Sequence, residues 1–245
     1  FFGNETIYLS FSEVFTKLEI TTTSVVSVDR PPPPMAALTP AWTTIADAAL
    51  AARDLSPRSP VHMLYQSRKV PLVPEVTAYG ARSFPTASTP VLTGALDLMT
   101  RIKTDFAYDP EATDVTTPVG EAFQKRRGVC QDFAHIMIAA LRGLGLPAAY
   151  VSGYLRTHPP PGKPRLEGAD ATHAWVEVWC GEATGWVALD PTNAMVAGQD
   201  HIVIATGRDY ADVAPVDGVI MTAGGHGLKV MVDVIPLTEV GKRER

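Results

Sequence analysis

Apolar residues recur at steps of three and four positions in two stretches of the chain, residues 92–106 and residues 133–144. This spacing is the period of a helix that buries one face, so both stretches are predicted as amphipathic helices. Gly145 and Pro147 follow the second stretch and are typical of a helix end.

Two shorter stretches are also predicted to be helical. Residues 41–54 are rich in alanine, and residues 75–82 follow Pro74, a residue that suits the first position of a helix. Residues 59–72 lie between them and are interrupted by prolines, so they are predicted to be irregular.

Strands are predicted where the period changes to two. Residues 172–179 and 186–190 alternate between the two faces of a strand, and residues 148–155 are predicted as a further strand that precedes them. Residues 6–10 and 15–23 are rich in β-branched and aromatic side chains, which predicts strands near the start of the chain.

A run of four prolines, Pro31 to Pro34, separates the predicted N-terminal strands from the helices. Such a run favours an extended linker. We therefore expect a partial N-terminal β region with its proline linker over residues 1–38, and a catalytic core over residues 39–245.

Composition excludes several classes of protein. The 245 residues carry a formal net charge of −5 and are 46% hydrophobic, which is typical of a globular protein and gives no reason to expect nucleic acid or an anionic membrane as a partner. No apolar run approaches the ~18 residues needed to span a bilayer. The chain starts with neither methionine nor a signal peptide, so a cytoplasmic location is expected only from the absence of such signals, and the true N-terminus is not seen.

Cys130 lies where a loop becomes the predicted helix of residues 133–144. Unpaired N–H groups and the positive end of the helix dipole favour a thiolate there, which suits a nucleophile. A small apolar residue at the start of a core helix is the alternative interpretation. The basic run Lys125, Arg126 and Arg127 fits a solvated face, or a field that slightly favours the thiolate.

The two strands after residue 171 predict a hairpin. If residues 180–183 form its loop, Trp179 lies opposite Thr184, and His173 lies opposite Asp190. Directly opposed side chains are close enough for a carboxylate to reach an imidazole. A register shift of two residues would keep His173 and Asp190 on one face, whereas a shift of one would separate them.

His173 therefore stands out among the histidines, because a catalytic imidazole needs a third group that fixes its tautomer. A His–Asp pair that only stabilises the sheet is the alternative. Asp170 could compete with Asp190, but it lies in a loop. Other histidines are expected to be structural or exposed: His62, His135, His201 and His226.

Four segments together resemble the bacterial transglutaminase-like superfamily, whose members are often assigned as cysteine proteases. They are residues 128–135, 147–155, 172–178 and 186–193, and residues 200–218, 228–236 and Phe2-Gly-Asn4 add to the resemblance. The resemblance implies an α+β fold, a papain-like, transglutaminase-like core with the nucleophile on a helix packed against an antiparallel sheet, plus an N-terminal β segment.

The resemblance also implies a triad in which Cys130 is the nucleophile, His173 the general base and acid, and Asp190 the orienting carboxylate. We expect cysteine-dependent acyl transfer on a peptide or protein substrate through a thioester, with water as the acceptor. The alternatives are an amine-accepting transglutaminase and a catalytically silent peptide-binding relative.

The backbone N–H of Cys130 is the natural first donor to an oxyanion. Gln124 is the candidate second donor, at a spacing that resembles the oxyanion glutamine of papain-like proteases. Gln131, Trp175 and Trp179 are weaker candidates. Neither zinc-type Cys/His spacing nor an EF-hand loop occurs, so we expect no metal, no calcium requirement and no cofactor. Cys130 and Cys180 are both expected to be free thiols.

Overall fold

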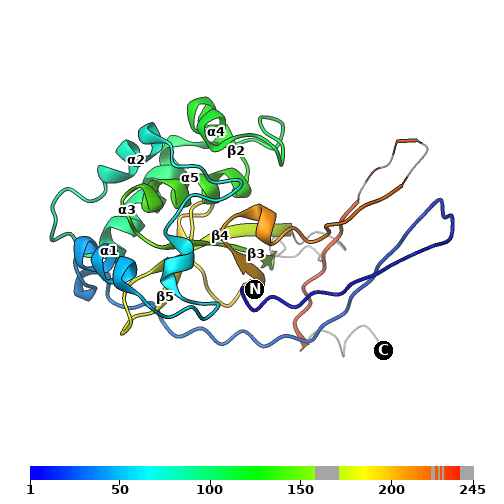
Figure 1. Cartoon of the computed structure of the whole chain (residues 1–245), viewed down its shortest axis with the longest axis horizontal. Coiled ribbons are helices and arrows are strands. Elements are labelled where there is room, and N and C mark those ends of the chain that lie inside the picture. The colour runs from blue at the N-terminus through cyan, green and yellow to red at the C-terminus, as the bar shows by residue number, and fades with distance from the viewer. Residues whose placement is uncertain (158–170, 222–223, 226, 228, 238–245) are drawn as a thin grey trace, which may run out of the picture.

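Helix α5 (Cys130–Gly143) lies at the centre of the fold in the computed structural model, which describes residues 1–157, 171–221, 224–225, 227 and 229–237. Helices pack on one side of α5, and a sheet packs on the other (Figure 1). No described helix is long and apolar enough to cross a membrane. The other helices are α1 (Trp42–Ala51), α2 (Pro74–Ala81), α3 (Val91–Asp105) and α4 (Val119–Lys125), with short 3-10 turns η1 (Ala36–Leu38), η2 (Pro60–Met63) and η3 (Tyr210–Asp212).

The main sheet has five strands in the order β6-β5-β4-β3-β7, and every neighbouring pair is antiparallel. A separate parallel pair, β1 with β2, lies just before α5. This architecture confirms the predicted α+β class. The strands are β1 (Ala107–Tyr108), β2 (Arg127–Gly128), β3 (Ala148–Leu155), β4 (Ala171–Trp179), β5 (Trp186–Asp190), β6 (Met195–Val196) and β7 (His201–Gly207).

The helices and strands of the core follow the sequence pattern closely. Pro74 occupies the first turn of α2, as predicted, and β3 spans the predicted residues. Gly145 follows α5 with φ of 77°, a left-handed conformation that glycine adopts without strain, so the predicted stop is confirmed.

One feature of α5 differs from the expectation of a single buried face. Every residue from Asp132 to Arg142 is buried. The apolar side of the helix packs on β3 and β4, while α2, α3 and α4 cover its other side, so the helix is enclosed all round. Its start, at Cys130, is the part that stays half-buried.

Arg142 connects the end of α5 to the loops around it. Arg142 is 2% exposed, and burial lowers the pKa of its guanidinium to about 10, so the group stays charged at neutral pH. The charge is dispersed over carbonyl groups, which is the way in which a buried cation is tolerated. Arg142 donates hydrogen bonds to the carbonyl oxygens of Met63, Tyr65, Ala148 and Arg208 and to Ser67 Oγ, at 2.7 to 3.1 Å.

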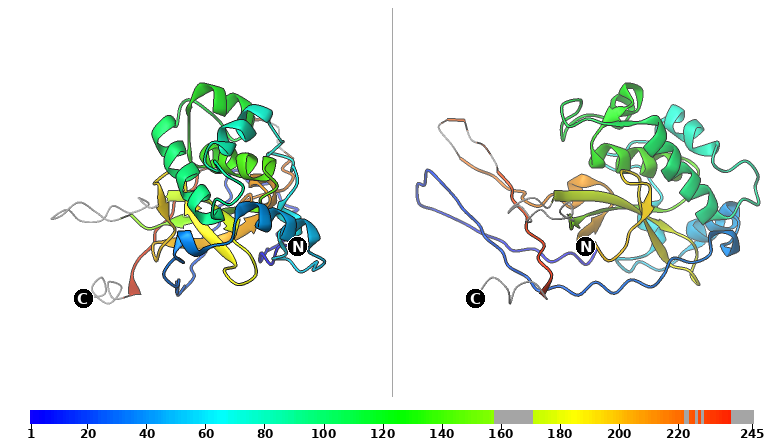
Figure 2. Two further views of the ribbon diagram at one scale, coloured as in Figure 1. Left: turned by 90° about the vertical axis from the view of Figure 1, so that its left-hand side faces the viewer. Right: turned by 180° about the vertical axis from the view of Figure 1, so that it is seen from behind.

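The N-terminal strands predicted over residues 6–10 and 15–23 are not formed, although all of residues 1–35 are described. This segment runs out from the core and returns without helix or strand, and its apolar side chains are largely exposed (Figures 1 and 2). β-branched residues favour an extended backbone, but a strand also needs a ladder of backbone hydrogen bonds to a neighbouring strand, and the described part of the chain shows no such ladder here. The boundary at residue 38 stays a prediction.

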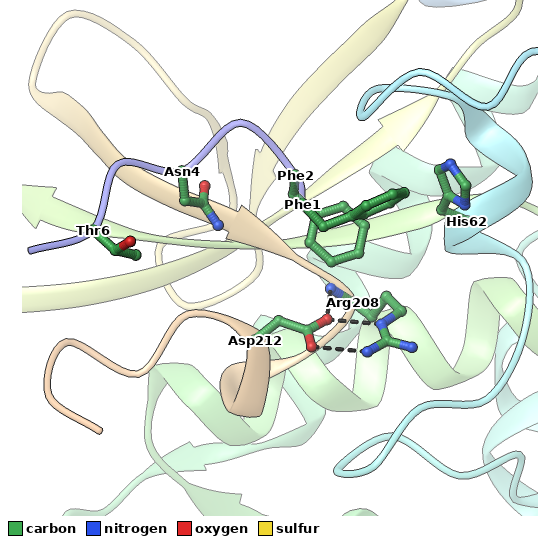
Figure 3. Close-up of a pocket in the computed structure, with 7 residues that line it drawn as sticks. All are labelled: Phe1, Phe2, Asn4, Thr6, His62, Arg208 and Asp212. Atoms are coloured by element: carbon green, nitrogen blue, oxygen red, sulfur yellow. Dashed lines mark hydrogen bonds and ion pairs between the residues drawn. The ribbon is translucent and has the colours of Figure 1, made fainter. Parts of the chain in front are cut away.

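Side chains of this segment form hydrogen bonds with the outer edge of β7 at two points. The side chain of Asn4 pairs with the backbone of Thr206 in both directions, at 2.8 and 2.9 Å. Arg30 donates to the carbonyl of His201 at 3.2 Å. Between the segment and the core lies a pocket of about 520 Å³ (Figure 3), lined by Phe1, Phe2, Asn4, Thr6, His62, Arg208 and Asp212.

Arg142→Met should lower the free energy of unfolding by about 2–4 kcal/mol, because methionine keeps the buried volume but leaves several carbonyl groups without donors. Urea unfolding measures the change. Arg68→Met, an exposed arginine in the neighbouring loop, is the matched control and should change stability by less than about 0.5 kcal/mol. Equal effects of the two substitutions would contradict the role given to Arg142.

Candidate active site

Cys130 is the first residue of α5, in the position that the sequence predicts. Val129 before it is extended, with φ of −114°. The N–H groups of the first turn have no acceptor within the helix, and the positive end of the helix dipole points to the sulfur. The position therefore favours the thiolate form.

A buried carboxylate fixes the backbone in front of Cys130. Asp132 Oδ2 accepts hydrogen bonds from the backbone N–H of Val129 at 2.8 Å and from Thr113 Oγ1 at 2.6 Å. Gly128 makes room for this carboxylate, since a Cβ there would lie 2.5 Å from Asp132 Oδ2. The turn that presents the cysteine is thus tied to α5 and to the loop of Thr113.

The register predicted for the hairpin is wrong by two residues. Trp179 pairs with Trp186, not with Thr184, and the loop is six residues long, Cys180 to Gly185. Gly185 and Gly181, both at positive φ, close this loop through a hydrogen bond of 2.7 Å between Gly185 N–H and the Gly181 carbonyl. Two left-handed glycines permit this longer turn, and residue spacing alone does not distinguish it from a four-residue loop.

His173 and Asp190 still meet, because a shift of two residues leaves both on one face. His173 Nε2 and Asp190 Oδ2 lie 2.8 Å apart, and their side chains are 7% and 0% exposed. The Cys130 sulfur lies near the same imidazole and raises its pKa. Since Asp190 engages Nε2, the nitrogen left for the sulfur is Nδ1.

Opposing effects set the charge of His173. Burial by itself lowers the pKa of the imidazole, but the hydrogen bond to Asp190 and the effect of the nearby Cys130 sulfur outweigh burial and raise that pKa to about 9. The imidazole is therefore protonated at neutral pH. The three residues predicted as a triad thus lie together, with a cationic imidazole between two acceptors; their catalytic roles stay predictions.

Asp190 is a buried anion that accepts hydrogen bonds on both oxygens. Oδ1 accepts from the backbone N–H groups of Thr192 at 2.9 Å and Asn193 at 3.2 Å. Oδ2 accepts from His173, from His201 Nε2 at 3.1 Å and from Asn193 Nδ2 at 2.7 Å. Burial alone would raise the pKa of Asp190, but these donors hold it well below its usual range.

Two of these donors, Asn193 and His201, were not predicted from the sequence. A signal for Asn193 existed, because Asp190-Pro-Thr-Asn193 is the pattern of a turn closed by an aspartate side chain. His201 was expected to be structural or exposed, and it is 1% exposed. It begins β7, which reaches the site only because β7 pairs with β3.

His173, Asp190 and His201 each offer one potential metal-ligand atom, and these atoms lie within 4.8 Å of one another. Two imidazoles and a carboxylate can hold zinc or iron. However, His201 Nδ1 accepts a hydrogen bond from Gly198 N–H at 3.2 Å, which places the proton of His201 on Nε2. A metal needs that Nε2 lone pair, so the cluster fits a hydrogen-bond network and does not fit a metal site.

The other predicted candidates lie in varied surroundings. Gln124 is exposed on α4, and its role as oxyanion donor stays a prediction. Gln131 donates to the carbonyl of Val115 at 3.3 Å. Trp175 is fully buried, and Trp179 is nearly so. Asp170 and His226 lie outside the described residues.

The basic run before Cys130 is engaged elsewhere. Lys125 pairs with Glu121 at 2.8 Å, and Arg127 pairs with Asp109 at 3.5 Å. Arg126 lies over aromatic rings, 4.2 Å from the ring centre of Phe123. These contacts support the interpretation of the run as a partly solvated face.

Cys180 and His135 are buried groups that the triad does not include. Both cysteines are free thiols, as expected, and burial raises the pKa of Cys180 to about 12. Burial lowers the pKa of His135 to about 4, and its Nε2 accepts a hydrogen bond from Tyr210 N–H at 3.2 Å. His135 therefore packs as a neutral core residue, as its place on the helix predicts.

Comparison with known proteins places this site in a family. Residues 79–191, which include Cys130, His173 and Asp190, match the sequence profile of the transglutaminase-like superfamily. An uncharacterised protein of Mycobacterium tuberculosis is 41% identical over 253 residues, which span 96% of this chain and 75% of that protein. The chain belongs to the transglutaminase-like superfamily.

A further protein sequence and a crystal structure are also similar to part of this chain. A protein-glutamine gamma-glutamyltransferase of Pseudomonas aeruginosa is 39% identical over 90 residues, 36% of this chain and 13% of that protein. The crystal structure of a candidate cysteine protease from Cytophaga hutchinsonii matches with a TM-score of 0.55 and 28% identity. That match covers 67% of this chain, which spans about half of the solved chain (51%).

The charge of His173 predicts the result of an NMR titration. The imidazole of His173 should titrate at a pH of about 9 and that of His135 at about 4. In Asp190→Asn, the charge and hydrogen bond of Asp190 that raise the pKa of His173 are removed, so that pKa should fall clearly below about 9. A pKa for His173 that the substitution leaves unchanged would contradict the account of the site.

Because the proton of His201 lies on Nε2, we expect metal ions to affect neither the stability of the protein nor the reactivity of Cys130. Dialysis against a chelator should change neither the melting temperature nor the rate at which Cys130 is alkylated, because the network offers no free Nε2 lone pair. Both quantities are measured before chelation, after it, and after zinc is added back. A melting temperature or alkylation rate that changes on chelation and recovers when zinc is added would show that the cluster holds a metal.

Proposed function

We propose that this protein is a cysteine-dependent acyl-transfer enzyme that acts on amide bonds of a peptide or protein through a thioester, with water as the final acceptor. The observation that carries the proposal is the chain of contacts from Cys130, at a helix start, through the imidazole of His173 to the buried carboxylate of Asp190. A cationic imidazole beside a sulfur stabilises the thiolate, which is the nucleophilic form.

In the first half of the reaction, the Cys130 sulfur attacks the amide carbonyl carbon. A C–S bond forms, the carbonyl electrons move to oxygen, and the backbone N–H of Cys130 stabilises that oxyanion. His173 then donates its Nδ1 proton to the amide nitrogen, the C–N bond breaks, and the amine leaves.

In the second half, the neutral imidazole of His173 takes a proton from water, and the water oxygen attacks the thioester carbon. The C–S bond breaks, the acid is released, and the thiolate and imidazolium are restored. Asp190 stays ionised in both halves, because its donors hold the pKa of that carboxyl far below neutrality. It orients the ring and stabilises its charge.

An exposed tyrosine of β1 lies near the thiol. Cys130 is half-buried, and Tyr108 is 58% exposed and pairs with Gly128, two residues before the cysteine. Burial raises the pKa of Tyr108, and the negative charge of Cys130 raises it further, so the phenol lies near the sulfur. We infer that a substrate approaches Cys130 past Tyr108.

A second candidate reaction has a specific observation in its favour. One of the similar proteins is a protein-glutamine gamma-glutamyltransferase, 39% identical over 90 residues, and an amine can replace water as the acceptor of the same thioester. The similarity to a candidate cysteine protease covers more of the chain, 67% against 36%, and favours hydrolysis.

Alkylation by iodoacetamide tests the activated thiol without a substrate. At neutral pH Cys130 should be alkylated faster in the unaltered protein than in His173→Ala, because a neighbouring imidazole activates the sulfur as a nucleophile. Mass spectrometry after digestion separates Cys130 from Cys180, which should stay unmodified because burial raises its pKa to about 12.

Cys130→Ala and Cys180→Ala form a matched pair for the reaction itself. Peptide libraries are incubated with each variant, with and without a fluorescent primary amine. Cys130→Ala should lower turnover on the order of a thousandfold, and Cys180→Ala should retain it. Amine incorporation in excess of hydrolysis would replace the peptidase by the transglutaminase, and equal turnover by both variants would refute the proposal.

A further inference from the structure

Two imidazoles donate to the same carboxylate oxygen. His173 Nε2 lies 2.8 Å and His201 Nε2 lies 3.1 Å from Asp190 Oδ2, and they approach from β4 and β7 respectively. The triad uses only the first of these bonds. A second buried donor with no part in the proposed chemistry therefore needs an explanation.

Three contacts within the described part of the chain fix the position of His201. Its Nδ1 accepts the Gly198 N–H at 3.2 Å, which commits the proton to Nε2. The indole of Trp175 packs edge-on against it, with ring centres 5.2 Å apart. Arg30 donates to its backbone carbonyl at 3.2 Å. The imidazole is thus a fixed donor aimed at Asp190.

We propose that His201 is a positioning residue of the active site: it fixes Asp190 and, by sharing Oδ2, limits the basicity that Asp190 gives to His173. This inference rests on the proposed function. Each donor that stabilises the carboxylate reduces its pull on the proton of His173. Without His201, His173 would hold its proton more tightly.

The consequence appears in the second half of the reaction, where His173 must be neutral to accept a proton from water. A higher pKa of His173 leaves less of the neutral imidazole at a given pH. In the described part of the chain, the charged or titratable groups next to His201 and Asp190 are His173 from β4 and Arg30 from the N-terminal segment. Cys130 from α5 acts on His173 directly, as Asp190 does.

Two substitutions distinguish the effect of the His201 N–H donor from the effect of the shape of its ring. His201→Phe keeps a ring beside Trp175 but loses the N–H donor, and His201→Gln retains an amide donor at a similar reach. The pKa of His173 is measured by NMR titration. Deacylation is measured with p-nitrophenyl acetate, whose initial burst reports acylation of Cys130 and whose steady state reports release by water.

His201→Phe should raise both the pKa of His173 and the pH of half-maximal deacylation by about half a unit or more, and His201→Gln should restore at least half of that shift. His135→Phe is the matched control: it removes another buried imidazole and should leave both values unchanged. A change that only weakened the fold would affect His135→Phe and His201→Phe alike.

The inference is overturned if His201→Phe leaves the pKa of His173 at its original value, or if His201→Gln shifts it as far as His201→Phe does. Failure of the proposed function looks different. In that case the unaltered protein shows no burst on Cys130, and the NMR titration of His173 still reports the effect of His201 on its own.

Discussion

The site depends on the burial of one negative charge, the carboxylate of Asp190. An ionised carboxylate removed from water is strongly unfavourable unless fixed donors replace its hydration. Here the side chain is 0% exposed, and its donors come from β4, from the turn after β5 and from β7. The order of the strands in the sheet is what brings those donors to one point.

The second constraint is the burial of α5. Because helices and sheet enclose this helix from Asp132 to Arg142, its start is held rigidly relative to β4. The Asp132 carboxylate then fixes the turn that carries Cys130. A rigid helix start and a rigid imidazole are what proximity catalysis requires, since reacting groups must stay within a fraction of an ångström of their productive positions.

Much of this could be predicted from the sequence because the core elements obey local rules. Periodicity located α3 and α5, and the alternation in β4 and β5 placed His173 and Asp190 on one face. The hairpin register was wrong because the loop length depends on left-handed glycines, which spacing does not reveal. The predicted contact between His173 and Asp190 is nevertheless formed, because a register shift of two residues leaves both side chains on the same face of the sheet.

Other features depend on contacts between distant segments, which no local pattern encodes. His201 reaches Asp190 only through the pairing of β7 with β3, and Arg142 binds carbonyl groups from three separate regions. The N-terminal residues show the opposite case. Their composition favours strands, yet none of residues 1–35 forms one, although the segment reaches β7 through side chains.

The central claim is that Cys130 and His173 interact directly before any substrate binds. An NMR titration of His173 in the Cys130→Ala variant tests this most directly. The account predicts a pKa of His173 clearly below the value of about 9 in the unaltered protein, because the sulfur contributes to raising it. A pKa of His173 that the substitution leaves at about 9 would contradict the claim.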